Sequence, residues 1–519
     1  MLTGSGISSA AAIDFNRASS SDLVWKYIDR GDRVMAEAGF DVVLEGGDVI
    51  DGTGAPRRRA DVGIRDEQIA AIGDLSESDA GRRIDVSNRI VAPGFIDVHT
   101  HDDRMLLCEP DFDMKVSQGV TTVVVGNCGI SLAPLVTDVP PPPLDLIGDA
   151  DWYKFATFDS FLRAVEQAPA SVNAAFLVGH STLRVGIMDR LDRGATSEEI
   201  KSMRGLLEEG LEAGAVGFST GLFYAPSQKA PTEEVIELSR SLKAFGARYV
   251  THMRNESDQV IDSLEETFTI GREADVPVIV SHHKVQGKHN FGRSCETLAC
   301  IEKHMHHQDI GLDIYPYAAS STVLKADAIA LAEKVKITWS KSRPDLAGRM
   351  LDDIAKEFGC DLFEAAEMLQ PAGAIYFSMS EEDVQRILTF KHAMIGSDGL
   401  PHDEFPHPRL WGTFPRVLGH YCRDLELFPL EEAVRRMTGL SADKFGLKGR
   451  GRIAEGNFAD ICVFDEKTVI DRADFDNPTA PSGGIESVFV NGRMVWGAGA
   501  HTGARPGKAL RRGMGPLAA

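Results

Sequence analysis

Long apolar runs are absent from this sequence, in which no stretch approaches the roughly 18 residues that a helix needs to cross a bilayer. The first residues also lack a basic segment followed by an apolar one, which is the pattern of a secretory signal peptide. We therefore expect neither a membrane span nor a membrane partner.

Cysteines are few and irregularly placed. The seven thiols form no CxxC pair and no regular framework. An odd, scattered set in a chain of 519 residues is typical of a reduced, cytoplasmic protein. No nucleophile elbow carrying a serine is visible either, which argues against a covalent serine mechanism.

Extended basic patches are also lacking. The chain has 77 acidic and 55 basic residues, a formal net charge of -22, and the basic run at 57–59 is short. Such a surface repels phosphate backbones, so we expect no nucleic-acid partner. An anionic substrate is still compatible with this charge, because a pocket can hold local arginine and lysine.

Two segments near the ends of the chain show the period-two alternation and turn residues of antiparallel β structure. They are residues 41–92 and 446–500, and we expect them to form one small β-sandwich domain. Residues 1–40 are expected to be an N-terminal extension, with disorder left open and Met35 as an alternative start, and 501–519 a C-terminal tail.

Between these segments, short apolar runs alternate with helical periods. Eight runs are visible: Ile96–His101, Val120–Gly126, Ala174–His180, Ala215–Thr220, Tyr249–Met253, Val278–His283, Gly311–Tyr315 and Met394–Asp398. Eight parallel strands with intervening helices predict an α/β fold, a (β/α)8 TIM-like barrel over residues 93–445. The interval 318–392 is too long for an ordinary connection, and we expect a lid insertion with its own helices.

Polar side chains fall at the carboxyl ends of these runs, where barrel active sites are built. Side chains alternate along a strand, so His99 and His101 point to the same side and can bind a single metal ion. The other candidate ligands are Cys128, His252, His282 and Asp398. Each residue alone has an ordinary structural explanation, and their joint placement on five strands favours a metal site.

Other histidines fit this pattern less well. His283 has the parity opposite to His282, which predicts a structural or supporting role. His180 is ambiguous, and His304, His306 and His307 lie in a helical stretch that favours the surface.

These residues sit in motifs that resemble the amidohydrolase superfamily, and more finely its D-aminoacylase (N-acyl-D-amino-acid deacylase) branch. The motifs are PGFIDVHTHDD from Pro93, GVTTVVVGNCGIS from Gly119, GAVGFSTGLFYAP from Gly214, THMRNE from Thr251, SHHK from Ser281, DIYPYAASST from Asp313, and IGSDG with HPR from Ile395. The likeness runs in order from about residue 40 to about residue 500.

The resemblance implies a zinc enzyme in which a thiolate replaces the carboxylated lysine of hydantoinases and dihydroorotases. A tight zinc site would use Cys128, His252 and His282. A second, weaker site would use His99, His101 and Asp398. Asp398 would take a proton from the attacking water and pass it to the departing amine.

The same resemblance implies that the substrate is an N-acyl-D-amino acid. Arg409 would hold its α-carboxylate through a bidentate fork, and Lys284 can face the barrel mouth. Tyr224, Tyr315 and Ser321 match family positions that contact the substrate. A hydrolase of cyclic amides or β-aspartyl dipeptides and a catalytically inactive scaffold are the alternatives.

Overall fold

Eight parallel strands form the centre of the computed structural model, which describes residues 39–516. They are β6 (Phe95–Asp97), β7 (Val120–Val125), β10 (Asn173–Gly179), β11 (Gly217–Gly221), β12 (Arg248–His252), β13 (Val278–Val280), β14 (Ile310–Ile314) and β18 (Ala393–Ile395), paired in chain order. Parallel contacts between Thr100 and Gly399 join the segments that follow β6 and β18, so the ring closes there. The predicted barrel is confirmed.

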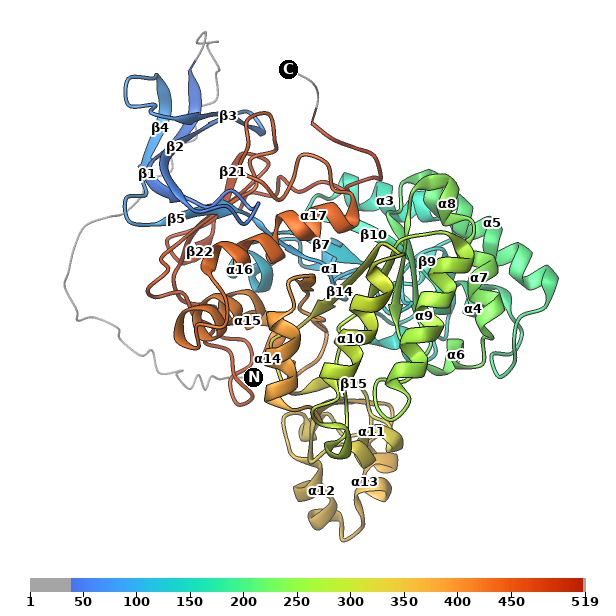
Figure 1. Ribbon diagram of the computed structural model, residues 1–519. Helices are drawn as coiled ribbons and strands as arrows, with labels where there is room; N and C mark the ends of the chain where they lie inside the picture. Colours follow the sequence, from blue (N-terminus) through green and yellow to red (C-terminus); the bar gives the residue numbers. More distant parts are fainter. Residues whose placement is uncertain (1–38, 517–519) are drawn as a thin grey trace, which may run out of the picture. The chain divides into compact units, whose positions relative to one another are not determined.

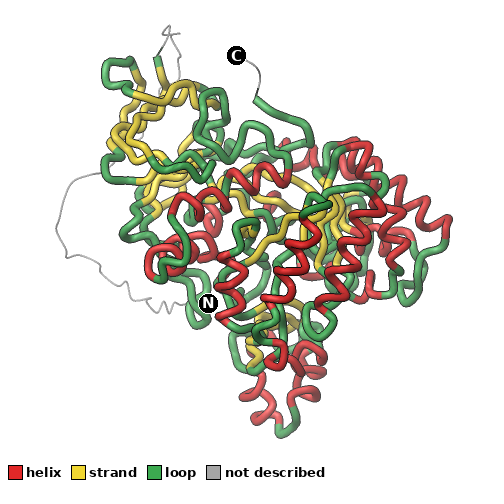
Figure 2. The backbone as a smooth tube through the Cα atoms, in the orientation of Figure 1, coloured by secondary structure: helices red, strands yellow, loops and turns green. Residues whose placement is uncertain are grey.

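Helices surround this barrel (Figures 1 and 2). They are α3 (Phe158–Gln167), α4 (His180–Ile187), α5 (Ser197–Ala213), α7 (Thr232–Ser239), α8 (Leu242–Phe245), α9 (Val260–Ala274), α10 (Ser294–Met305), α14 (Glu381–Thr389), α15 (Arg409–Arg416), α16 (Leu430–Met437) and α17 (Gly439–Phe445). The longest, α5, begins at a capping box between Thr196 and Glu199 and ends at Gly214, whose φ of 116° suits glycine.

Short elements fill the connections. They are α1 (Met105–Cys108), α2 (Asp113–Val116), α6 (Ala225–Gln228), the two-stranded pair β8 (Leu135–Val136) and β9 (Lys154–Phe155), the 3-10 turns 144–146, 288–290 and 344–346, and the π-helical segment Val417–Asp424. Within residues 39–516, no helix combines the length and the apolar composition that a bilayer crossing requires.

Strands from both ends of the chain meet in a second, nine-stranded sheet (Figure 1). The first group is β1 (Phe40–Val49), β2 (Arg58–Arg65), β3 (Gln68–Gly73), β4 (Ala80–Asp85) and β5 (Ile90–Pro93), and the second is β19 (Ile461–Phe464), β20 (Ile485–Val490), β21 (Arg493–Gly497) and β22 (Ala500–His501). The antiparallel pairing of β5 with β19 joins the groups. Most of the expected extension 1–40 lies outside the described residues.

The insertion after β14 contains strands as well as the expected helices. A three-stranded antiparallel sheet in the order β15 (Ser320–Val323), β17 (Ala372–Phe377), β16 (Lys334–Ser340) packs with α11 (Ala326–Leu331), α12 (Leu351–Phe358) and α13 (Leu362–Leu369). Its apolar side chains form a cluster of their own. Since β15 follows β14 closely, this sheet is held near the carboxyl end of the barrel.

A buried carboxylate connects the terminal segments to the barrel. Asp460 accepts hydrogen bonds from Asn173 Nδ2 at 3.2 Å and from the backbone N–H of Asn491 at 2.8 Å. Asp460 also forms an ion pair with Arg450, and each of these two residues is only 4% exposed. Removing the carboxylate would leave a buried guanidinium without its counter-charge.

We therefore expect Asp460→Ala to lower the free energy of unfolding by about 3–5 kcal/mol, the usual cost of breaking a buried pair. Denaturant or thermal unfolding measures this loss. Asp443→Asn removes an exposed partner of Arg452 and is the control, with an expected loss of about 1 kcal/mol or less. Equal losses in the two variants would contradict the connecting role of Asp460.

Candidate metal centre

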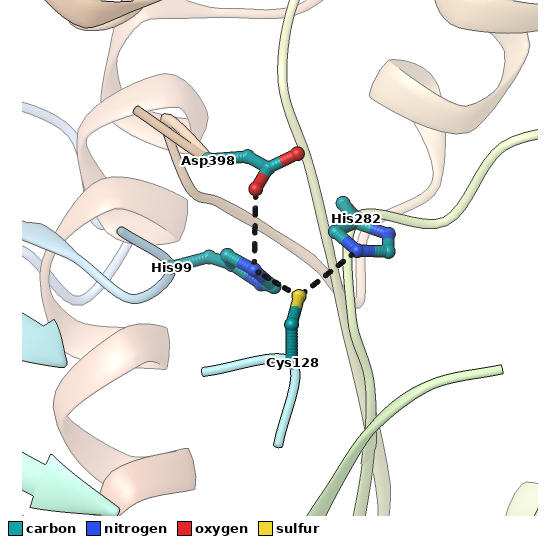
Figure 3. A group of neighbouring side chains, drawn as sticks. All are labelled: His99, Cys128, His282 and Asp398. Carbon is teal, nitrogen blue, oxygen red and sulfur yellow. Dashed lines mark hydrogen bonds and ion pairs between the residues drawn. The ribbon is translucent and has the colours of Figure 1, made fainter. Parts of the chain in front are cut away.

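The thiol of Cys128 lies among side chains from opposite sides of the barrel (Figure 3). Its Sγ is 3.3 Å from His99 Nε2 and 3.4 Å from His282 Nε2. Asp398 Oδ1 lies 3.5 Å from His99 Nε2. All four residues are buried, and their donor atoms lie within 4.8 Å of one another.

The two remaining predicted ligands belong to the same cluster. His252 Nδ1 is 3.0 Å from His282 Nε2, and His101 Nε2 is 3.3 Å from Asp398 Oδ1. The structure therefore brings together all six side chains that the sequence singled out.

These separations suit a metal ion. Zinc–nitrogen and zinc–sulfur bonds of about 2.1 and 2.3 Å place neighbouring donors of a tetrahedral site about 3.4–3.7 Å apart. The observed separations of 3.0–3.5 Å need only small adjustments. Thiolate, imidazole and carboxylate are also donors that zinc accepts.

The electrostatics of the cluster favour the anionic forms of its thiol and its carboxylate, while the pKa values of His99, His101 and His282 are raised, so a metal would displace protons from these imidazoles. Burial alone raises the pKa of the Cys128 thiol, but the neighbouring His99 and His282 hold that pKa well below its usual value. Burial likewise raises the pKa of Asp398, and Arg409 and His282 hold it well below the ordinary range. The anionic forms, which are the ones that bind a metal, are thus favoured for both groups.

The backbone at the site is strained. Cys128, His282 and Asp398 have φ angles of 54°, 36° and 50°, in the left-handed region that side-chain-bearing residues rarely adopt. The barrel strands end earlier than expected, at Asp97, Val280 and Ile395. Except at His252, which ends β12, these turns after the strands aim the donors, and such strain is typical of functional sites.

Two carboxylates that the sequence analysis did not single out support the histidines. Glu256 Oε1 lies 3.1 Å from His282 Nδ1, and its Oε2 lies 3.6 Å from His252 Nε2. Asp313 lies 3.4 Å from His99 Nδ1 and accepts the backbone N–H of His282 at 2.9 Å. Glu256 follows His252 by four residues in THMRNE, a spacing that could have indicated it.

The expected substrate-binding residues surround a cavity beside the cluster. Tyr224, Lys284, Tyr315 and Ser321 line it together with His252, His282 and Asp398. Arg409 is buried behind it, with Nη1 2.9 Å from Asp398 Oδ2 and its guanidinium 4.6 Å from the centre of the Tyr315 ring.

Several donors around this cavity have no protein partner. Ser321 Oγ, Tyr315 Oη and Arg409 Nε are buried without a hydrogen bond to any described residue. Unpaired buried polar groups are costly unless a ligand satisfies them. Their arrangement indicates a binding position for an anionic or strongly polar group.

The other histidines lie away from the cluster. His283 Nε2 contacts Thr297 Oγ1 at 2.8 Å, consistent with a structural role. His180, which the sequence left ambiguous, lies between Glu234 and Ser227 at 3.1 Å from each. His304 lies on α10 and is half-buried, and His306 and His307 follow that helix and are exposed, as expected of surface residues.

A buried cluster of metal-binding side chains at the carboxyl end of a (β/α)8 barrel defines a candidate metallohydrolase. The sequence model of the Amidohydrolase family matches residues 82–336 and 368–496. The chain belongs to this family.

Individual relatives refine the assignment. The chain is 59% identical to D-aminoacylase from Alcaligenes xylosoxydans xylosoxydans over 473 residues, 91% of this chain and 98% of that protein. A solved D-aminoacylase, described for its binuclear metal centre with one-metal activation and second-metal attenuation, matches with a TM-score of 0.90 and 58% identity over 91% of this chain and 100% of that one.

An N-acyl-D-glutamate deacylase from Bordetella bronchiseptica, complexed with zinc and a phosphonate inhibitor, matches with a TM-score of 0.89 and 46% identity. That match also covers 91% of this chain and 100% of that one. The chain therefore lies on the D-aminoacylase branch that its motifs resemble.

Glu256→Gln tests whether the Glu256 carboxylate supports metal binding. Gln keeps the size of the side chain but loses the charge next to two candidate ligands, so we expect metal affinity to fall roughly 10–100-fold. Competition with a chelator measures this affinity. Glu266→Gln, which alters the ion pair with Arg254, is the control, and unchanged affinity in Glu256→Gln would refute the supporting role.

Proposed function

We propose that the protein hydrolyses the amide bond of N-acyl-D-amino acids, giving a carboxylate and a free D-amino acid. The observation that carries this proposal is the thiolate–imidazole–carboxylate cluster directly beside a cavity with unpaired polar donors. The names of the relatives supply the substrate class and its D configuration.

Metal dependence follows from the donor set and from the metal centres of the two solved relatives. We assign the tight site to Cys128, His252 and His282, and the weaker one to His99, His101 and Asp398. The contacts of Glu256 with both His252 and His282 support treating these two histidines as one set. When bound, zinc supplies a Lewis acid and lowers the pKa of water to about 7.

Asp398 is the proposed proton carrier of the reaction. Its carboxylate lines the cavity and is ionised, so it can accept the proton of the attacking water. It then protonates the leaving nitrogen, because an amide nitrogen departs readily only as a neutral amine. Arg409 pairs with the other carboxylate oxygen and so holds Asp398 in place.

The α-carboxylate of the substrate is assigned to Arg409, Tyr315 and Ser321, whose free polar atoms would be satisfied by two carboxylate oxygens. Lys284 and Tyr224 complete this binding surface. The Tyr224 hydroxyl already contacts Thr322 Oγ1 at 2.9 Å, which ties it to the insertion.

We assign the catalytic domain to residues 93–445 and the lid to residues 318–392, because the insertion supplies Ser321 and Tyr376 to the cavity wall. The division at 41–92 and 446–500 is supported by the pairing of β5 with β19. Cytoplasmic location and the absence of nucleic-acid or membrane partners stay predictions from cysteine pattern and charge.

The first test is amine release from paired N-acetyl-D- and N-acetyl-L-amino acids by zinc-loaded protein. We expect turnover of the D series, and a fall in kcat of about 10²–10⁴-fold in Asp398→Asn, as for loss of a general acid–base group. Asp443→Asn is the matched control. Zinc content is measured in each variant, since Asp398 is also an assigned ligand.

No release from either series, with zinc bound, would overturn the proposed activity. Turnover of cyclic amides or β-aspartyl dipeptides would then select the first alternative. Absence of bound zinc would favour an inactive scaffold.

The cavity also predicts which side chains are preferred. Within residues 39–516, Lys284 is the only lysine or arginine that lines it, and Glu256 neutralises this ammonium group at 2.8 and 2.9 Å. Phe223, Ala328 and Leu331 contribute apolar surface. An acidic substrate side chain would therefore be desolvated without a free counter-charge.

We expect kcat/KM for N-acetyl-D-leucine to exceed that for N-acetyl-D-aspartate and N-acetyl-D-glutamate at least about tenfold, a difference of roughly 1.4 kcal/mol. A panel of N-acetyl-D-amino acids measures the ratio. A preference for the acidic substrates would contradict this expectation. It would show that Lys284, or another cation, leaves its protein partner and pairs with the side chain of the substrate.

A further inference from the structure

A second group of metal-binding side chains lies on the outside of the barrel, between the neighbouring helices α9 and α10 (Figure 1). Cys300 and His304 are one turn apart on α10, so they project from the same face of that helix. Glu265 reaches them from α9. None of the three belongs to the cluster around Cys128.

The donor atoms of this group are close enough to share one ion. His304 Nε2 lies 3.2 and 3.1 Å from the two oxygens of Glu265, and Cys300 Sγ lies 3.7 Å from Glu265 Oε1. All three donors fall within 4.8 Å of one another. Neighbouring donors around a tetrahedral zinc ion are about 3.4–3.7 Å apart.

The charges of the group also suit a divalent cation. A thiolate and a carboxylate carry two negative charges, which balance the ion, and the imidazole completes the set as a neutral ligand. Burial and then the adjacent Glu265 carboxylate raise the pKa of the Cys300 thiol to about 11, so a cation would bind by displacing the thiol proton. Sulfur and imidazole donors select zinc and late first-row metals over magnesium and calcium.

The surroundings hold the donors in place while leaving access. The His304 ring packs against Phe268 with ring centres 4.6 Å apart, which fixes its orientation. The Glu265 side chain is 47% exposed and that of His304 17%, so an ion can reach the group from solvent. Three protein ligands leave a fourth position for water.

We propose that Glu265, Cys300 and His304 form a peripheral metal site that binds Zn²⁺ or a related transition-metal ion such as Co²⁺. Binding there ties α9 to α10. The proposal is independent of the hydrolase activity, because its ligands lie outside the catalytic cluster.

Cobalt titration of the full-length enzyme, with one equivalent of zinc already in place, tests the site. Cobalt bound to a thiolate has a charge-transfer absorption that oxygen and nitrogen ligands do not produce. We expect Co²⁺ to bind with this absorption, in addition to any ion that the weaker catalytic site takes. Cys300→Ser should abolish the absorption, and His304→Ala should weaken binding by more than the roughly 10–100-fold that follows loss of an outer hydrogen-bond partner.

Cys295→Ser is the matched control, since Cys295 is an exposed thiol of the same helix and not part of the group. It should leave the titration unchanged. A thiolate absorption that persists in Cys300→Ser, or no such absorption in the parent enzyme, would overturn the proposal. Because the readout is metal binding, the result does not depend on whether N-acyl-D-amino acids are hydrolysed.

Discussion

The contacts of the Cys128 thiolate with His99 and His282 set the main constraint on this structure. The two imidazoles follow β6 and β13, and they lie 3.3 and 3.4 Å from one sulfur atom. The contacts therefore require that the barrel is closed and that the carboxyl ends of its strands lie at the same level. They also require left-handed backbone at Cys128, His282 and Asp398, a cost that the surrounding packing and the partners of each donor must offset.

The buried charged groups around this cluster each lie next to a group of opposite charge. Glu256 holds Lys284 and approaches two histidines, Asp313 holds a third histidine, and Arg409 faces Asp398. In the low dielectric of the barrel mouth, an unpaired charge would be costly, and each of these groups has an opposite charge close by. This arrangement explains how a strongly acidic chain can present local polar donors to an anionic substrate.

The sequence predicted the barrel and the six clustered side chains because both depend on local pattern. Strand-sized apolar runs mark the eight strands, and polar residues at their ends mark the site. The partners Glu256 and Asp313 were not singled out, since nothing local shows which carboxylate turns towards a histidine. The sequence indicated that the two terminal β segments join in one domain, but neither the particular pairing of β5 with β19 nor the sheet within the insertion, because strand partners are long-range properties.

The central claim, that Cys128 and histidines bind one zinc ion, is tested most directly by zinc K-edge X-ray absorption. The measurement uses Cys300→Ser protein loaded with one equivalent of zinc, so that a thiolate from the peripheral group does not contribute. We predict one sulfur scatterer at about 2.3 Å together with nitrogen or oxygen scatterers at about 2.0–2.1 Å. A zinc environment of nitrogen and oxygen alone would contradict the account.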